Sequence, residues 1–150
     1  MKTKINGLDC ILLVDDDQFT NYINVKVIQK AKVNTHIQMT TSAEEALDFL
    51  REEGRFTDAA GIPKPGIIFL DLNMPGMNGW EFLDEFRTLL EERKARIVLV
   101  ILTSSNNPME MEKASLNKDV VAFWTKPLRP EKVVALVDAH FFGHGTPGYN

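Results

Sequence analysis

The sequence predicts an α/β protein built on a doubly wound, five-stranded parallel sheet with helices on both faces. Two observations lead to this prediction. Short apolar runs alternate with segments of helical periodicity along the chain, and three of the runs are continuously apolar, as in strands buried on both faces of a parallel sheet. Five strands that alternate with five helices imply parallel βαβ units with right-handed crossovers.

Five runs are the expected strands. In chain order they are Cys10–Val14, Thr35–Met39, Ile67–Leu70, Ile97–Leu102 and Val120–Trp124. The second run mixes polar and apolar residues, so it carries the weakest signal. Cys10 is the single cysteine and cannot form an internal disulfide, which fits a reducing compartment. We expect Cys10 to fill space inside the first strand rather than to act as a reactive thiol.

The segments between the strands carry helix signals. Ser42-Ala43-Glu44-Glu45 is a capping box that opens one helix, and Gly54 can close that helix. Asn107 followed by Pro108, and Pro130, mark two later helix starts. The apolar residues at helical spacing are Ile23, Val27, Ile28 and Ala31, then Ala46, Leu47 and Leu50, then Phe82, Leu83, Phe86, Leu89 and Leu90, and finally Val133, Val134, Leu136, Val137 and Phe141.

Length and composition indicate one soluble globular domain. The chain has 150 residues, of which 44% are hydrophobic and 25% charged. We expect residues 1–150 to form one domain with a core over about residues 7–142, a tail over 143–150 and no output domain. The net charge of −4 argues against nucleic acid as a partner, and no apolar run is long enough to span a membrane. We expect a cytoplasmic protein. Arg55–Gly66 is a loop interrupted by proline and glycine, and its role is open.

Polar side chains gather where the strands end. In an open parallel sheet, ligands bind beyond the carboxyl ends of the strands. Asp15-Asp16-Asp17 follows the first strand, Asp71 ends the third, Thr103-Ser104-Ser105 follows the fourth, and Lys126 comes soon after the fifth. Carboxylates from neighbouring strands repel one another unless a cation neutralises them, and Mg²⁺ prefers such oxygen ligands. The sequence therefore predicts a Mg²⁺ site at this edge.

Such a site is suited to receiving a phosphoryl group, because phosphoryl transfer depends mostly on positioning and on charge neutralisation. Asp71 would be the nucleophile that forms an acyl phosphate, with Lys126 and Mg²⁺ neutralising charge and Thr103 donating a hydrogen bond. Each residue alone has a plainer explanation: a helix cap for residues 15–17, a turn for Asp71, a loop for residues 103–105 and a solvated surface lysine for Lys126. Their occurrence together, each at the correct end of its strand, favours the site.

Four segments resemble the receiver domain of two-component response regulators. They are Ile11–Asp17, Phe69–Gly79, Leu102–Ser104 and Lys126–Leu128, and the resemblance extends over about residues 7–142. It is strongest to stand-alone bacterial receivers that carry segments like Asp71–Trp80 and Leu102–Pro108, and the fold it implies is that of the chemotaxis receivers. The resemblance implies a flavodoxin-like sheet of order 2-1-3-4-5.

The resemblance also implies roles for the acidic residues. Asp71 would be the phosphoacceptor. Asp15 and Asp16 would be the acidic pair that holds Mg²⁺, with Asp16 the stronger candidate for direct ligation. Asn73 would offer its backbone carbonyl to the same ion, and Asp71 would be a further ligand.

A second set of residues would contact the phosphoryl group or move in response to it. Thr103 and Lys126 would contact its oxygens, and Phe123 matches the switch aromatic that turns inward when Thr103 moves. Phe123 replaces the tyrosine of some members, which removes a hydroxyl. The Lys126–Pro127 peptide bond is expected to be cis, as in the family. Ser105 occupies a position that helps to set the dephosphorylation rate in the family.

The function implied is that of a single-domain response regulator in a two-component or phosphorelay system. It would accept a phosphoryl group on Asp71 from a histidine kinase or a histidine phosphotransfer protein. It would signal through phosphorylation-dependent contacts with an unknown target protein. It would not be an enzyme beyond its own phosphoryl transfer and autodephosphorylation. Homodimerisation through the last helix is open, because its apolar residues Val133, Val134, Val137, Phe141 and Phe142 exceed what one buried stripe needs; the alternative is that all are core.

Other functions fit the residues less well. A haloacid-dehalogenase-like phosphatase needs a second acid two residues after its nucleophile, where this chain has Asn73. A flavodoxin-type binder would place a Ser/Thr/Gly-rich loop after the first strand, where this chain has aspartates. A pseudo-receiver scaffold would lack part of the acidic, hydroxyl and lysine set. His140 and His144 could bind a metal ion, but a frayed helix end is the simpler explanation.

Overall fold

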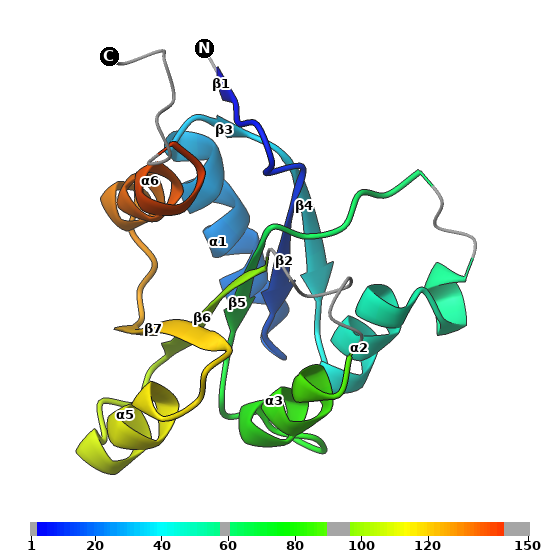
Figure 1. Ribbon diagram of the computed structural model, residues 1–150, viewed down its shortest axis with the longest axis vertical. Helices are drawn as coiled ribbons and strands as arrows, with labels where there is room; N and C mark the ends of the chain where they lie inside the picture. The colour runs from blue at the N-terminus through cyan, green and yellow to red at the C-terminus, as the bar shows by residue number, and fades with distance from the viewer. Residues whose placement is uncertain (1–2, 58–60, 90–96, 143–150) are drawn as a thin grey trace.

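The computed structural model describes residues 3–57, 61–89 and 97–142 and contains a five-stranded parallel sheet (Figure 1). Its strands are β2 (Cys10–Val14), β4 (His36–Thr40), β5 (Ile67–Leu70), β6 (Val98–Thr103) and β7 (Val120–Thr125). They lie in the order β4-β2-β5-β6-β7, and each neighbouring pair is parallel. Numbered within the sheet this is the order 2-1-3-4-5, so the predicted fold class and order are confirmed.

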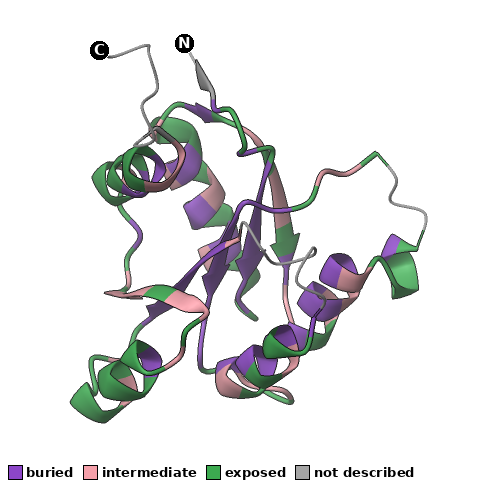
Figure 2. Cartoon of the chain, viewed as in Figure 1, coloured by how far each residue is buried: buried purple, intermediate pink, exposed green. Residues whose placement is uncertain are grey.

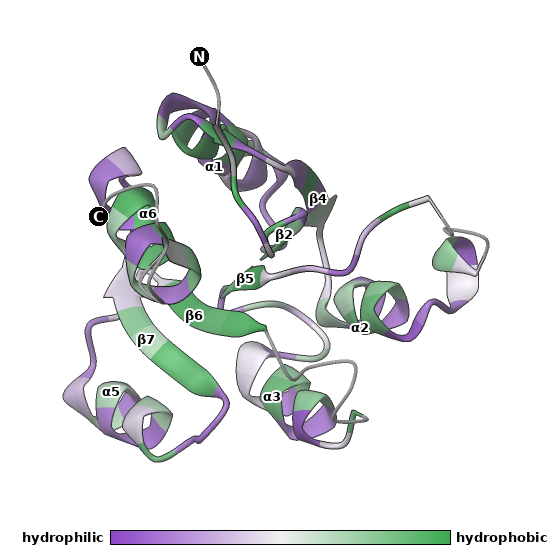
Figure 3. Cartoon of the chain, turned by 45° about the horizontal axis from the view of Figure 1, so that its top comes forward, coloured by the Kyte–Doolittle hydropathy of each residue, from purple (hydrophilic) through white to green (hydrophobic). Residues whose placement is uncertain are grey.

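Helices cover both faces of this sheet. They are α1 (Gln18–Lys30), α2 (Ala43–Arg51), α3 (Gly79–Arg87), α5 (Pro108–Ser115) and α6 (Pro130–Val137). One apolar cluster packs α2, α3 and α5 against one face, and a second packs α1 and α6 against the other. Figure 2 shows the central strands buried between helices whose outer sides are exposed, and Figure 3 shows the apolar strands enclosed by them. Burial on both faces explains the continuously apolar runs.

Local sequence signals explain where several helices begin. The Ser42 side chain accepts a hydrogen bond from the Glu45 backbone N–H, as predicted, but the Glu45 carboxylate accepts from the Thr41 N–H rather than from that of Ser42. Asn107 caps α5 with Pro108 at its first position, as predicted, and Pro130 opens α6.

The end of α2 differs from the prediction. Glu52 takes the left-handed conformation after Arg51, with φ 59°, and closes the helix two residues before Gly54. Gly54, also at positive φ, instead opens the 3₁₀ helix η1 (Gly54–Phe56). The prediction was wrong at this point because a left-handed cap favours glycine but does not require it.

Several boundaries and one helix face also differ. The predicted strands Thr35–Met39 and Ile97–Leu102 each lie one residue later in the structure, and Thr103 is the last residue of β6. On α1, Ile23 is 40% exposed and the buried residues include Asn21 and Asn24. The short strand β1 (Thr3–Lys4), which pairs with β3 (Val33–Asn34), was not predicted.

The last helix leaves little apolar surface for a dimer among its described side chains. Val133 and Val137 are buried, Phe141 is half-buried against the same cluster, and Val134 is 41% exposed. Most of these side chains are therefore core. The chain continues past α6 as the π-helix η2 (Asp138–Phe142), which includes His140. Leu90, the side chain of Phe142, and His144 with the tail 143–150 lie outside the described residues.

Two further expectations concern Cys10 and the membrane. Cys10 is fully buried and unpaired in β2, so its predicted role as a core residue is confirmed. Burial raises the pKa of its thiol to about 12. Within the described part of the chain, no helix combines the length and the apolar character needed to cross a bilayer.

Candidate functional site

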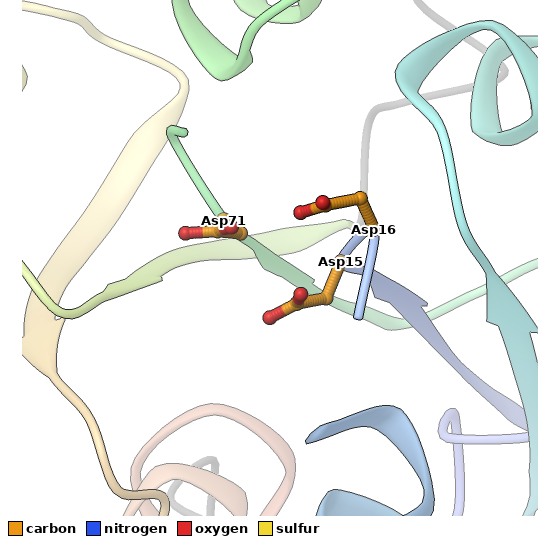
Figure 4. A group of neighbouring side chains, drawn as sticks. All are labelled: Asp15, Asp16 and Asp71. Carbon is orange, nitrogen blue, oxygen red and sulfur yellow. The ribbon is translucent and has the colours of Figure 1, made fainter. Parts of the chain in front are cut away.

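Three aspartates from two neighbouring strands meet at the carboxyl edge of the sheet. Asp15 and Asp16 follow β2, and Asp71 follows β5, which pairs directly with β2. The Asp71 backbone N–H extends this pairing by donating to the Val14 carbonyl at 2.9 Å. One carboxylate oxygen from each aspartate lies within 4.8 Å of the others (Figure 4). Asp15 and Asp71 are buried, whereas Asp16 is exposed.

Asp17 has a different role. Its side chain accepts hydrogen bonds from the Phe19 backbone N–H at 2.9 Å and the Thr20 hydroxyl at 3.0 Å, and it is the N-cap of α1. The hydrogen bond from Thr20, followed by that from Phe19, lowers the pKa of Asp17. The helix-cap explanation therefore holds for Asp17, and Asp15 and Asp16 remain available to the site.

Lys126 reaches into the acidic group from the loop after β7. Its Nζ lies 2.7 Å from Asp15 Oδ2 and 3.7 Å from Asp71 Oδ1. Its backbone N–H donates to the Thr103 carbonyl at 2.7 Å, which ties the ends of β7 and β6 together. The Lys126–Pro127 bond is cis, as the resemblance implied. With its side chain only 24% exposed, Lys126 is a partner of buried carboxylates and not a solvated surface lysine.

The electrostatic environment of Asp71 opposes its ionisation. Burial raises the pKa of Asp71 from 3.8 to about 6, against the lowering effect of the Lys126 charge. The charges of Asp15 and Asp16 raise the pKa further, and a hydrogen bond from the Asn73 backbone lowers it. At neutral pH most of the Asp71 carboxyl is still ionised, so the site holds more negative charge than Lys126 offsets.

Thr103 and Phe123 lie on the two strands at the other side of Asp71. Thr103 is fully buried, and its hydroxyl oxygen accepts a 3.3 Å hydrogen bond from the Ser105 backbone N–H. A hydroxyl that accepts one bond still has a proton to donate. Phe123 is half-buried and lies opposite Ile101 in the β6–β7 register.

Gly79 allows α3 to begin against the segment that carries Asp71. Its backbone N–H donates to the Leu72 carbonyl at 2.9 Å. A Cβ atom at Gly79 would lie 2.7 Å from both the Asp71 carbonyl oxygen and the Leu72 Cα. No side chain fits there, so glycine at this position keeps the loop after Asp71 close to the helix.

The residues present fit a small, hard divalent cation. Three carboxylate oxygens converge, and Mg²⁺ binds through a few carboxylates together with water and phosphate oxygens. Asp15, Asp16 and Asp71 would hold it, with the Asn73 carbonyl as the further ligand implied by the resemblance. Asn73 itself lies in the loop directly after Asp71, with an exposed side chain.

One residue of this region escaped the sequence-based prediction. Asn21, on α1, is 1% exposed, and its Nδ2 donates to the backbone carbonyls of Asp15 at 3.0 Å and Thr40 at 3.1 Å. A signal was present, because Asn21, Asn24 and Ile28 share a helical spacing that places two amides on the buried face.

Comparisons with known proteins agree with this geometry. The family model of the response regulator receiver domain matches residues 11–138. Response regulator Rcp1 of Synechocystis is 29% identical over 107 residues, which cover 71% of this chain and 69% of that protein.

Two solved structures show similar folds. A two-component response regulator from Cytophaga hutchinsonii is 35% identical with a TM-score of 0.77, over 91% of this chain and 97% of that one. The bacteriophytochrome response regulator RtBRR is 32% identical with a TM-score of 0.72, over 87% and 76% of the two chains.

Proposed function

The chain belongs to the response regulator receiver domain family, and from this premise we propose that Asp71 is its phosphoacceptor. The donor would be the phosphohistidine of a sensor histidine kinase or of a histidine phosphotransfer protein. The observation that supports this most directly is the convergence of the Asp15, Asp16 and Asp71 carboxylates with Lys126 at one edge of the sheet.

The reaction needs little from the protein beyond position and charge. A carboxylate oxygen of Asp71 attacks phosphorus, the P–N bond to the donor imidazole breaks, and its electron pair stays on the imidazole nitrogen. The new P–O bond is an acyl phosphate. Lys126 lies where its ammonium can attract a phosphoryl oxygen, and the buried Thr103 hydroxyl retains a proton for another.

A divalent cation fits this proposal. Mg²⁺ bound at the three carboxylates would supply positive charge to the phosphoryl oxygens. One solved structure of the relative Rcp1 is a Mn²⁺-bound form, which supports binding of a divalent cation by a protein of this family. The residues of this chain that we assign to the ion are Asp15, Asp16, Asp71 and the Asn73 carbonyl.

The signal would pass from Asp71 to the surface formed by α5, β7 and α6. A phosphoryl group adds roughly 1.5 to 2 negative charges and strong acceptor oxygens, which favour a packing with Thr103 drawn toward it. Phe123, on the strand beside Thr103, would change its position in response. Output would then occur through contact with a separate target protein.

Phosphorylation chemistry tests the proposal. Acetyl phosphate with Mg²⁺ should phosphorylate the wild-type chain, and beryllofluoride with Mg²⁺ should saturate the site and shift the amide signals of α5 and β7. The Asp71→Asn variant should do neither. Turnover of unrelated phosphate esters at a rate that depends on Asp71 would instead support a phosphatase, and unchanged amide signals with bound beryllofluoride would exclude the proposed switch surface.

A further inference from the structure

Asn21 joins the main chain beside the acidic pair to the neighbouring strand. Its Nδ2 spans the carbonyls of Asp15 and Thr40, which lie at the ends of β2 and β4. These two strands pair in parallel, but the chain leaves β2 at Val14 and turns into α1 through Asp15. The Asn21 amide therefore donates a hydrogen bond to the Asp15 carbonyl at the point where the chain leaves the β2–β4 pairing.

The rest of Asp15 is also held. Its backbone N–H donates to the Thr40 carbonyl at 3.2 Å, and its Oδ1 accepts from the Asp17 backbone N–H at 2.9 Å. Its Oδ2 faces Lys126. Among the described residues, Asn21 supplies the side-chain hydrogen bond to the Asp15 carbonyl, directly before the chain runs on to Asp16.

Burying an amide at this position has a cost. Asn21 Oδ1 is buried and has no hydrogen-bond partner among the described residues. A buried polar atom without a partner costs about 1–3 kcal/mol, and a leucine of similar size would avoid that cost. Packing alone therefore does not explain an asparagine here, and the two donated hydrogen bonds are what a leucine could not supply.

We propose that Asn21 is a positioning residue for the metal site, which keeps the carboxylates of Asp15 and Asp16 turned toward Asp71. The inference rests on the proposed function, because it takes the three carboxylates to be Mg²⁺ ligands. Residues that orient metal ligands without touching the ion commonly change metal affinity by about 10–100-fold when they are replaced. The effect of losing Asn21 should therefore appear in Mg²⁺ affinity.

The test compares two matched substitutions on α1. Asn21→Leu removes the two hydrogen bonds that the Asn21 amide donates. Asn24→Leu makes the same change at a second buried asparagine, about one turn further along the helix. Mg²⁺ affinity is measured from the amide shifts of the loop over residues 15–17, and stability from urea unfolding without metal. We expect Asn21→Leu to weaken Mg²⁺ binding by about tenfold or more, while Asn24→Leu leaves affinity within about twofold of the wild type.

The outcomes distinguish a failure of the proposed metal site from a failure of the positioning role of Asn21. If the wild-type chain binds no Mg²⁺, the proposed metal site fails. If the wild type binds Mg²⁺ and Asn21→Leu binds it equally well, or both variants weaken binding alike, the positioning role is overturned. Should Asn21→Leu not fold, Asn21→Ser replaces it, because its short side chain cannot span both carbonyls, and the same loss of affinity is expected.

Discussion

Lys126 Nζ lies 2.7 Å from Asp15 Oδ2, at the end of a side chain that is mostly shielded from water. The Asp15 side chain is only 5% exposed. This contact places a cation at the acidic edge of the sheet, next to the oxygens to which we assign Mg²⁺. Lys126 and the metal ion would therefore both offset the negative charge of the same carboxylates.

Replacing Lys126 with methionine should separate the effect of the lysine charge from the effect of the metal ion. Without Mg²⁺, Lys126→Met should lower the free energy of unfolding by about 1–3 kcal/mol at pH 7, because it leaves buried carboxylate oxygens without their hydrogen-bond donor. Its Mg²⁺ affinity should equal or exceed that of the wild type, because the lysine no longer competes. Urea unfolding and Mg²⁺ titration measure both, with Lys118→Met at an exposed lysine as the control. A weaker Mg²⁺ affinity in Lys126→Met would contradict the competition.

Asp71→Asn should stabilise the metal-free protein in a pH-dependent way. The folded pKa of about 6 exceeds the ordinary 3.8, so the folded state holds the Asp71 proton more tightly than the unfolded state does. Stability from this group is present below pH 3.8 and is lost as pH rises through about 6. In EDTA, the variant should therefore gain up to about 3 kcal/mol at pH 8 and about half of that at pH 5.

Urea unfolding at the two pH values measures this gain. Asp138→Asn, at an exposed aspartate in η2, is the matched control. A gain for Asp71→Asn that is equal at pH 5 and pH 8 would mean that the pKa of Asp71 is not raised.

Gly79→Ala should disturb the loop after Asp71. The added Cβ would meet backbone atoms of Asp71 and Leu72 at 2.7 Å, and backbone cannot yield as a flexible side chain can. We expect a loss of about 1–3 kcal/mol in unfolding free energy and slower phosphorylation by acetyl phosphate. Gly61→Ala is the matched control, because its Cβ would have no heavy atom within 4 Å. Equal stability and phosphorylation in the two variants would show that the close approach at Gly79 is not needed.

Cys10 should be inert in the folded protein. Its thiol is fully buried, and its pKa of about 12 leaves almost no thiolate at neutral pH. A disulfide reagent such as DTNB should modify Cys10 only after unfolding, at the rate of global opening, and should react at once in denaturant. Rapid modification under native conditions would show that β2 opens locally.

The sequence predicted the sheet well because its signal is strong and repeated. Strands buried on both faces, such as Ile67–Leu70, are continuously apolar and need little context to identify. The site followed from the same reasoning, since parallel strands bring the residues after them to one edge. The predicted end of β6 was one residue short, because its pairing with β7 extends to Thr103. Threonine occurs both in strands and in loops, so its type does not mark the end of the strand.

The features that were missed depend on contacts distant in sequence. Helical spacing places Asn21 on the buried face of α1, but its hydrogen-bond partners, the carbonyls of Asp15 and Thr40, are set by the tertiary structure. The pairing of β1 with β3 involves two residues on each side, too few for a periodic signal. The resemblance had already assigned Asp15 and Asp16 to the acidic pair, and the structure adds that the third aspartate, Asp17, caps α1.

The most direct test of the central claim is to locate the phosphoryl group itself. The chain is incubated with acetyl phosphate and Mg²⁺, the acyl phosphate is trapped by borohydride reduction, and the modified residue is identified by peptide mass spectrometry. We predict modification at Asp71 alone, absent from Asp71→Asn and from reactions with EDTA. Modification at Asp15 or Asp16, or none at Asp71 in a folded chain that binds Mg²⁺, would contradict the assignment of Asp71 as the phosphoacceptor.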